Sequence, residues 1–239
     1  MSTQACAAVV RWLQRSLVTA ACAVLAACQT YPSVSESQAK RVDLRLQLAS
    51  AYLDRGQPEV ALTEAQRALE VDPGNAQAHN VLAMALLALQ RFDPALQAMR
   101  QATALAPNDL SLQHNLAWLQ CAAGQPEQAL QTFEQLLLQA APPFDVARTQ
   151  FSRGVCAMQA QQPEVAQRGL EHAMQDVRYA DAARFGLAKL MVQSQDWAHA
   201  MRLLAAMPAA QRATPAVQAL QADIDAQFER SKQEATLMN

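Results

Sequence analysis

The sequence has few of the residues that build catalytic loops, β-sheets or nucleic-acid-binding surfaces. Its 239 residues include only 6 glycines and 5% aromatic residues, and 19 Lys and Arg are balanced by 21 Asp and Glu. An all-β domain would need more β-branched, aromatic and glycine residues, and a nucleic-acid-binding protein would carry a basic excess. The 51% of hydrophobic residues excludes a disordered chain. Ala, Leu and Gln, which favour helices, dominate what remains. The composition therefore predicts an all-α protein that binds no nucleic acid.

Motifs for catalysis, cofactors and metals are missing as well. The sequence contains no glycine-rich phosphate loop, no G-x-S-x-G and no Cys/His set with zinc spacing. The four histidines lie in separate segments without metal-ligand spacing: His79, His114, His172 and His199. We therefore expect no enzyme activity, no catalytic residues, no metal, no cofactor and no small-molecule substrate.

The N-terminal segment, 1–27, differs from the rest of the chain. It contains no acidic residue, and the basic residues Arg11 and Arg15 precede an apolar stretch over residues 16–27. A membrane-spanning helix needs about 20 apolar residues, so this stretch is short for a permanent anchor. A basic start followed by a short apolar segment is typical of a secretory signal peptide. We predict that residues 1–27 form such a signal.

The end of this segment resembles a bacterial lipobox. Its sequence is Leu25-Ala26-Ala27-Cys28, and the resemblance implies cleavage before Cys28 and acylation of that cysteine. An ordinary signal peptide that contains a cysteine is the alternative. The next residue is Gln29 rather than Asp, which by resemblance to enterobacterial lipoproteins favours the outer membrane, facing the periplasm. Each buried methylene of the acyl chains contributes about 0.8 kcal/mol to anchoring. Residues 28–41 are expected to be the lipidated cysteine and a tether.

Internal repetition is the main signal in the remaining chain. The segment Val71-Asp72-Pro73-Gly74-Asn75 matches Leu105-Ala106-Pro107-Asn108-Asp109. The sequence Gly56-Gln57-Pro58-Glu59 recurs as Gly124-Gln125-Pro126-Glu127 and as Gln161-Gln162-Pro163-Glu164. The interval between Pro73 and Pro107 is the repeat length of the tetratricopeptide repeat (TPR), about 34 residues. The period and these markers together resemble that repeat, in which each unit is a pair of antiparallel helices.

The resemblance implies a right-handed superhelix of about five to six repeats. Small residues at the eighth and twentieth positions of a unit let its two helices approach, and stacked units share a core. Proline after the turn suits the first residue of the second helix. The fourth unit is the weakest, because Arg153 stands where leucine is expected. The expected units are 42–75, 76–109, 110–143, 147–180 and 181–214, followed by a capping helix and tail over 215–239.

Two cysteines remain once the signal peptide and Cys28 are set aside. Cys121 and Cys156 both fall on the first helix of their units, and those units are adjacent, so the two side chains can face each other across a repeat junction. In an oxidising periplasm such a pair favours a disulfide. Two buried thiols that act as small apolar side chains are the alternative.

The resemblance also indicates where a partner would bind. In TPR superhelices the concave face is lined by the second, fifth, ninth and twelfth positions of the first helices. On this sequence those positions form a groove rich in aromatic residues and methionine, with a few polar groups, as peptide-binding surfaces are. Packing of these side chains against the neighbouring repeat is the alternative. The predicted groove residues are Asn80, Met84, His114, Trp118, Arg148, Phe151, Met158, Phe185 and Lys189.

A lipobox, a tether and a body of TPR units together resemble the PilF/PilW type of type IV pilus biogenesis lipoprotein. The segment from Arg45 to Gly56, RLQLASAYLDRG, is similar to the opening repeat of that family. The resemblance implies a pilotin that binds the secretin subunit PilQ and promotes its assembly in the outer membrane. The alternative is a TPR adaptor lipoprotein of another envelope complex, for outer-membrane protein assembly or regulation of cell-wall synthesis.

Overall fold

The computed structural model describes residues 35–139 and 144–237, and its regular elements there are all α-helices. The predicted signal peptide 1–27, Cys28 and the first part of the tether lie outside the described residues. The helices are α2 (Glu36–Asp54), α3 (Pro58–Val71), α4 (Ala76–Ala88), α5 (Phe92–Leu105), α6 (Leu110–Ala122), α7 (Pro126–Gln139), α8 (Val146–Gln159), α9 (Pro163–Ala173), α10 (Ala180–Gln193), α11 (Trp197–Ala205), α12 (Ala209–Arg212) and α13 (Pro215–Leu237).

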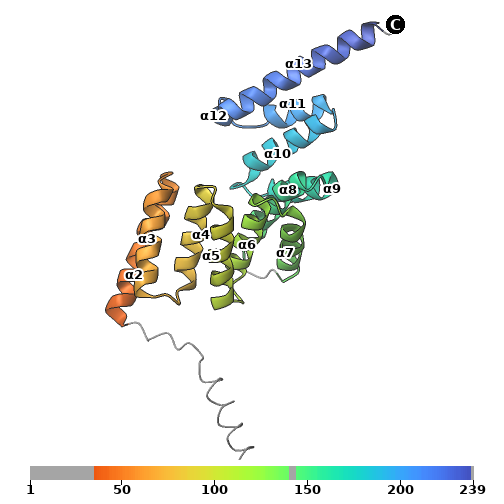
Figure 1. Cartoon of the computed structure of the whole chain (residues 1–239). Coiled ribbons are helices and arrows are strands. Elements are labelled where there is room, and N and C mark those ends of the chain that lie inside the picture. The colour runs from red at the N-terminus through yellow and green to blue at the C-terminus, as the bar shows by residue number, and fades with distance from the viewer. Residues whose placement is uncertain (1–34, 140–143, 238–239) are drawn as a thin grey trace, which may run out of the picture.

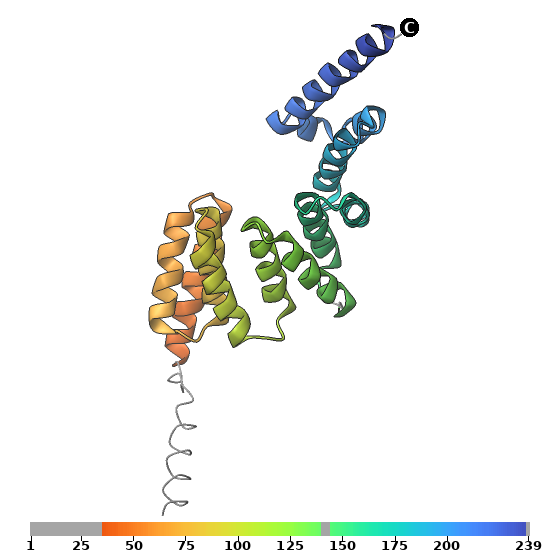
Figure 2. The same cartoon turned by 45° about the vertical axis from the view of Figure 1, so that its right-hand side comes forward.

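Five successive helix pairs, from α2–α3 to α10–α11, form a curved stack (Figures 1 and 2). The turn inside each pair contains one residue with a left-handed backbone, and these residues occupy equivalent places: Gly56, Gln90, Gly124, Gln161 and Gln195, with φ between 54° and 78°. Their spacing along the chain is constant except across the α7–α8 connection, where the sequence has a short insertion. The all-α repeat architecture predicted from the sequence is confirmed.

Small residues lie where the two helices of a pair are closest. The alanines at the eighth and twentieth positions are fully buried in every pair, and Gly154 takes the eighth position in the fourth. The prolines also occupy the expected place, since α3, α7 and α9 begin at Pro58, Pro126 and Pro163. A proline there loses no helical hydrogen bond. The buried alanines are Ala49, Ala61, Ala83, Ala95, Ala117, Ala129, Ala166, Ala188 and Ala200.

The N-terminal boundary of the stack differs from the expectation. Helix α2 begins at Glu36, so the last part of the expected tether 28–41 is helical. Ser35 accepts a hydrogen bond from the backbone N–H of Gln38, and the Gln38 side chain accepts one from the backbone N–H of Ser35. This reciprocal capping box satisfies two N–H groups at the helix start and thereby fixes it.

The C-terminal end also differs in detail from a simple cap. A short helix, α12, precedes α13, and α13 is a single long helix that packs on α11 through Val217 and Ile224. Figure 1 shows α13 extending away from the stack. The side chains of Val217 and Ile224 are both buried, so the first half of α13 covers the last helix pair.

Two glycines bring α8 and α9 unusually close together. A Cβ atom added to Gly169 would lie 2.8 Å from the backbone oxygen of Gln150 and 3.0 Å from the Cα atom of Gly154. Neither contact can be relieved by rotating a side chain, because both involve backbone atoms. The fourth helix pair therefore needs glycine at position 169.

We expect Gly169→Ala to lower the free energy of unfolding by about 1–3 kcal/mol, because α8 and α9 must separate. Alanine has a higher helix propensity than glycine, by about 0.5–1 kcal/mol. Propensity alone would therefore make the Gly169→Ala variant more stable, the opposite of the expected result. Gly186→Ala is the matched control, since its new Cβ would meet only the end of the Leu170 side chain, at 3.1–3.2 Å. Urea unfolding of the two variants checks the prediction, and equal effects would contradict it.

Candidate partner-binding face

The first helices of the pairs form the inner side of the stack. Successive first helices contact one another (α2 with α4, α4 with α6, α6 with α8, and α8 with α10), whereas α3, α5, α7 and α9 pack mainly between first helices. Helices that meet along one side and diverge along the other produce a wall that is concave on the meeting side. The exposed parts of α4, α6, α8 and α10 on that side are the candidate site, which we call the inner face.

The predicted groove residues differ in their exposure. Asn80, Met84, Trp118, Arg148, Phe151, Met158 and Phe185 are partly exposed, Lys189 is exposed and His114 is buried. The apolar ones among them also pack against the core clusters of the stack. Phe151, for example, stacks on Tyr179 with ring centroids 5.8 Å apart. These side chains combine a fixed packing contact with a surface that a partner can reach.

His114 is not a groove residue, because its side chain is only 2% exposed and lies between α6 and α8. Its Nδ1 atom is 3.1 Å from Thr149 Oγ1, and its Nε2 atom is 3.5 Å from Ser152 Oγ. The Thr149 hydroxyl donates to the carbonyl oxygen of Asp145, so it accepts from a protonated His114 Nδ1. The ring also contacts Phe133 at 5.4 Å between centroids. His114 therefore joins two repeats inside the core.

The pKa of His114 is lowered to about 3, mainly because the imidazole is buried. The positive charge of Arg148 also lowers this pKa, and its effect is larger than the opposite effect of Asp145. In the unfolded chain the pKa is about 6.5, so protonation at acid pH favours unfolding. The stability contributed by the neutral ring is complete above about pH 6.5 and falls by about 1.4 kcal/mol per pH unit below it.

We accordingly expect the free energy of unfolding to drop by about 2 kcal/mol between about pH 7 and pH 5 through this one residue. His114→Gln removes the titrating group and should flatten that slope, whatever its own effect on stability. His172→Gln, at an exposed position on α9, should keep it. Urea unfolding of the three proteins at both pH values measures the slopes, and a slope unchanged by His114→Gln would refute the assignment.

A chain of polar side chains crosses the inner face from α4 to α8. Asn115 Nδ2 donates to Asn80 Oδ1 at 2.9 Å, and Arg148 Nη2 donates to Asn115 Oδ1 at 2.7 Å. We call Asn80, Asn115 and Arg148 the polar ladder. Sequence reasoning missed Asn115, because it occupies the sixth position of its unit, outside the positions assigned to the groove. Its side chain links one predicted groove residue to the next.

A second polar cluster holds the start of α8 against the turn before α10. Asp145 caps α8 by accepting from the backbone N–H of Arg148 at 2.9 Å. It also accepts from Arg178 Nη1 at 2.8 Å and from the Tyr179 hydroxyl at 3.2 Å. Burial alone would raise the pKa of Asp145, but these hydrogen bonds and the Arg178 charge hold it below its usual range. The cluster fixes α8 relative to the fifth pair.

Cys121 and Cys156 form a disulfide between α6 and α8. Their Cα atoms are 5.8 Å apart, the usual separation for a bridge, and both residues are buried. The bridge therefore ties together the two helices that carry Asn115 and Arg148.

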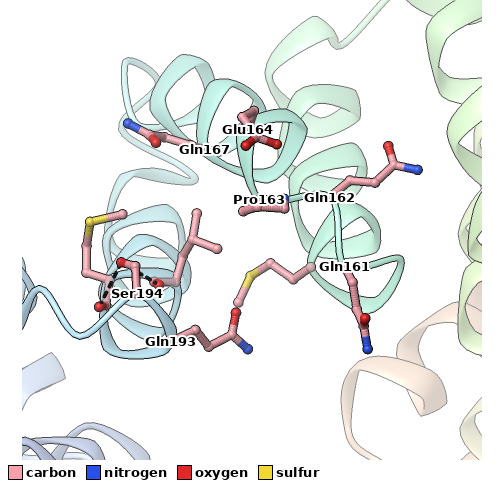
Figure 3. A pocket seen from close by; sticks show the side chains of 10 residues that line it. Gln161, Gln162, Pro163, Glu164, Gln167, Gln193 and Ser194 are labelled. Carbon is pink, nitrogen blue, oxygen red and sulfur yellow. Dashed lines mark hydrogen bonds between the residues drawn. The ribbon is translucent and has the colours of Figure 1, made fainter.

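A hollow of about 510 Å³ lies between the α8–α9 turn, the start of α9 and the end of α10. Figure 3 shows Gln161, Gln162 and Gln167 on one side of it and Gln193 and Ser194 on the other. Met158, one of the predicted groove residues, also lines it. Carboxamides both donate and accept hydrogen bonds, so these walls suit a peptide backbone.

Metal-binding clusters and membrane-spanning helices are both missing from residues 35–139 and 144–237. That part of the chain holds no group of three or more His, Cys, Asp or Glu side chains placed to bind a metal ion. Nor does any helix there combine the length and apolar character needed to cross a membrane.

Family comparisons agree with this architecture. Two tetratricopeptide repeat models match the chain, one over residues 46–109 and the other over residues 86–149 and 157–224. The second model alone covers more than half of the sequence, and the chain belongs to the tetratricopeptide repeat family. It is accordingly a protein–protein interaction scaffold, of a family whose members are mostly non-catalytic. Among curated proteins, none matches the sequence.

Several solved structures share the fold. Pseudomonas aeruginosa PilF is 20% identical, with a TM-score of 0.62 over 85% of this chain and 100% of PilF. PilW, a widely conserved type IV pilus biogenesis factor, is 20% identical, with a TM-score of 0.63 over 83% and 98% of the two chains. A thermophilic TPR protein of Thermus thermophilus is 22% identical, with a TM-score of 0.63 over 77% and 97%. At these identities the likeness is one of fold.

Proposed function

We propose that the protein is an outer-membrane lipoprotein that faces the periplasm, is anchored through Cys28 and assists type IV pilus biogenesis as a pilotin. Its inner face binds a secretin subunit and helps that subunit to reach or assemble in the outer membrane. The observation that carries the proposal is the combination of a lipobox at residues 25–28 with a helix-pair stack that matches the whole length of PilF.

The inner face supplies the binding chemistry for this role. Trp118 and Phe151 are partly exposed, and each is backed by a core cluster. Large aromatic side chains that are already fixed lose little conformational freedom on binding, which is why such residues dominate protein interfaces. Arg148 on α8 and Lys189 on α10 add positive charge to the same face.

The test is a pull-down from solubilised outer membranes with the full lipidated chain as bait. Recovery of a secretin is expected, and it should fall when Trp118 is replaced by alanine. Trp197→Ala is the matched control, because Trp197 is also partly buried against the core but lies on α11, the second helix of its pair. Circular dichroism verifies that both variants remain helical, since unfolding would mean that Trp118 acts in the core.

Two outcomes would overturn the proposal. Repeated absence of a secretin from the pull-down is one. The other is a deletion strain with normal pili and normal secretin multimers, which would favour an adaptor of another envelope complex.

Replacement of Cys28 by serine should release the protein from the outer membrane, and fractionation of cells measures this directly.

A further inference from the structure

Two leucines of α2 are exposed at positions that the later units cover. Leu44, at the third position of its unit, is 63% exposed, and Leu48, at the seventh, is 45% exposed. In the other four units the third position is buried and the seventh is buried or partly buried: Ala78, Leu112, Thr149 and Ala183, and Leu82, Leu116, Arg153 and Leu187. The preceding helix pair provides this cover, as α3 does for α4. No pair precedes α2 in the part of the chain that the structure describes, so this end of the stack is open (Figures 1 and 2).

Two arginines lie on the same side of α2 as these leucines. At 3.6 residues per turn, Arg41, Leu44, Leu48 and the C-cap residue Arg55 fall within about 60° of one another around the helix axis. We call these four residues the α2 stripe. Both arginines are exposed, and neither forms an ion pair within residues 35–139 and 144–237. The acidic residues of α2 lie about 100° away from the middle of the stripe: Glu36, Asp43 and Asp54.

The arginines of the stripe have no counterparts at the junctions between repeats. The residues equivalent to Arg41 are Asn75, Asp109, Val146 and Ala180, and those equivalent to Arg55 are Leu89, Ala123, Ala160 and Ser194. The charges are therefore additional to what packing against another helix pair requires. Leucines flanked by arginines suit the surface of a lipid bilayer, where apolar side chains reach the acyl chains and guanidinium groups bind the phosphates.

The proposed lipid anchor brings this stripe close to a membrane. Residues 28 to 35 are seven steps apart, which span at most about 25 Å when the chain is fully extended. Helix α2 begins directly after them, at Glu36. A helix tethered at such a short distance meets the bilayer at a high effective concentration, so a weak contact is sufficient to hold it there.

We propose that the α2 stripe lies against the inner leaflet of the outer membrane and binds anionic phospholipids. Leu44 and Leu48 enter the edge of the acyl-chain layer, while Arg41 and Arg55 bind lipid phosphates. The contact holds α2 along the membrane surface and so limits how the stack turns on its tether. This inference rests on the proposed function in requiring acylation of Cys28, and it does not depend on which protein the inner face binds.

The experiment places a fluorophore on the stripe of the full lipidated chain. Mass spectrometry first verifies that Cys28 is acylated. Leu48→Cys is then labelled with nitrobenzoxadiazole, while Cys121 and Cys156 are protected by their disulfide. In phosphatidylethanolamine vesicles that contain phosphatidylglycerol, the emission should shift to the blue and be quenched by brominated lipid. Leu138→Cys, labelled in the same way, is the matched control, because Leu138 is also exposed, at 84%, but lies on α7. Its label should stay in water.

Removal of the two charges tests the phosphate contacts. Arg41→Gln/Arg55→Gln in the chain labelled at position 48 should lower the ratio of bilayer-bound to free label by about fivefold for each arginine on vesicles with phosphatidylglycerol. Arg91→Gln/Arg100→Gln is the matched control: it removes two exposed charges that form no ion pair in the described residues, at α5. It should behave like the labelled parent, and circular dichroism verifies that both variants are helical.

The inference is overturned if the labels at positions 48 and 138 respond equally, or if the two pairs of arginine replacements have equal effects. Shielding of the position-48 label by an added secretin, but not by vesicles, would show a protein-docking face and also overturn it. Recovery of a secretin while this label stays in water would overturn the inference alone. A label in the bilayer without recovery of a secretin would overturn the pilotin proposal alone, and a Cys28 without acyl chains would overturn the anchoring on which both rest.

Discussion

Replacement of Phe133 by alanine is expected to lower the free energy of unfolding by about 3–5 kcal/mol, the usual loss for a large aromatic residue in a core. Phe133 lies on α7 and is 0% exposed, in the cluster that joins the third, fourth and fifth helix pairs. Its ring contacts His114 from α6. The substitution therefore leaves a cavity between the third and fourth helix pairs.

Leu138→Ala is the control for this prediction. Leu138 lies on the same helix but is 84% exposed, so its replacement should change stability by less than about 0.5 kcal/mol. Urea unfolding followed by far-UV circular dichroism compares the two variants. A loss for Phe133→Ala that is no greater than for Leu138→Ala would show that the helix pairs around α7 are not packed as described.

The repeat architecture could be predicted because its markers are local. Small residues at two positions mark all five units, and a proline after the turn marks the first, third and fourth. The turn at Gln161 shows that the repeat pattern predicts the backbone even where the residue type changes. Its backbone is left-handed like that of Gly56, although the residue type differs, because the flanking helices force the same path.

The boundary at Ser35 was missed although a signal for it was present. Ser35 and Gln38 have the spacing of a capping box, whereas the polar composition around them favours a tether. Helix α12 has no comparable signal. It is one turn long and depends on the packing of α13 against α11, which is tertiary information.

The candidate site was only partly predictable, because repeat register assigns a direction to a side chain but not its partners. His114 occupies a groove position, yet it turns toward Thr149 and Ser152 of the next repeat. Those hydroxyls can satisfy both ring nitrogens, and Phe133 covers the ring, so burial costs little. Asn115, one position further along, is also buried, and its side chain bonds to Asn80 and Arg148 of the neighbouring repeats. Both placements depend on residues about 35 positions away.

Loss of the Cys121–Cys156 disulfide is expected to destabilise the protein by about 2–4 kcal/mol. The bridge joins residues 35 positions apart, and closing a loop of this size removes much of the freedom of the unfolded chain. The same bridge holds α6 against α8 where the repeat pattern is weakest, since Arg153 replaces the expected leucine on α8.

Two manipulations separate the bridge from simple packing of the two sulfur atoms. Reductant should destabilise the unaltered protein, whereas Cys121→Ala/Cys156→Ala should be equally stable with and without it. If both cysteines were thiols, reductant would change nothing, and thiol counting on the denatured, unreduced protein would find both reactive. Because Trp118 and Phe151 lie on the two helices that the bridge joins, its reduction should also weaken recovery of a secretin in the pull-down. Unchanged recovery while stability falls would show that the bridge acts in folding alone.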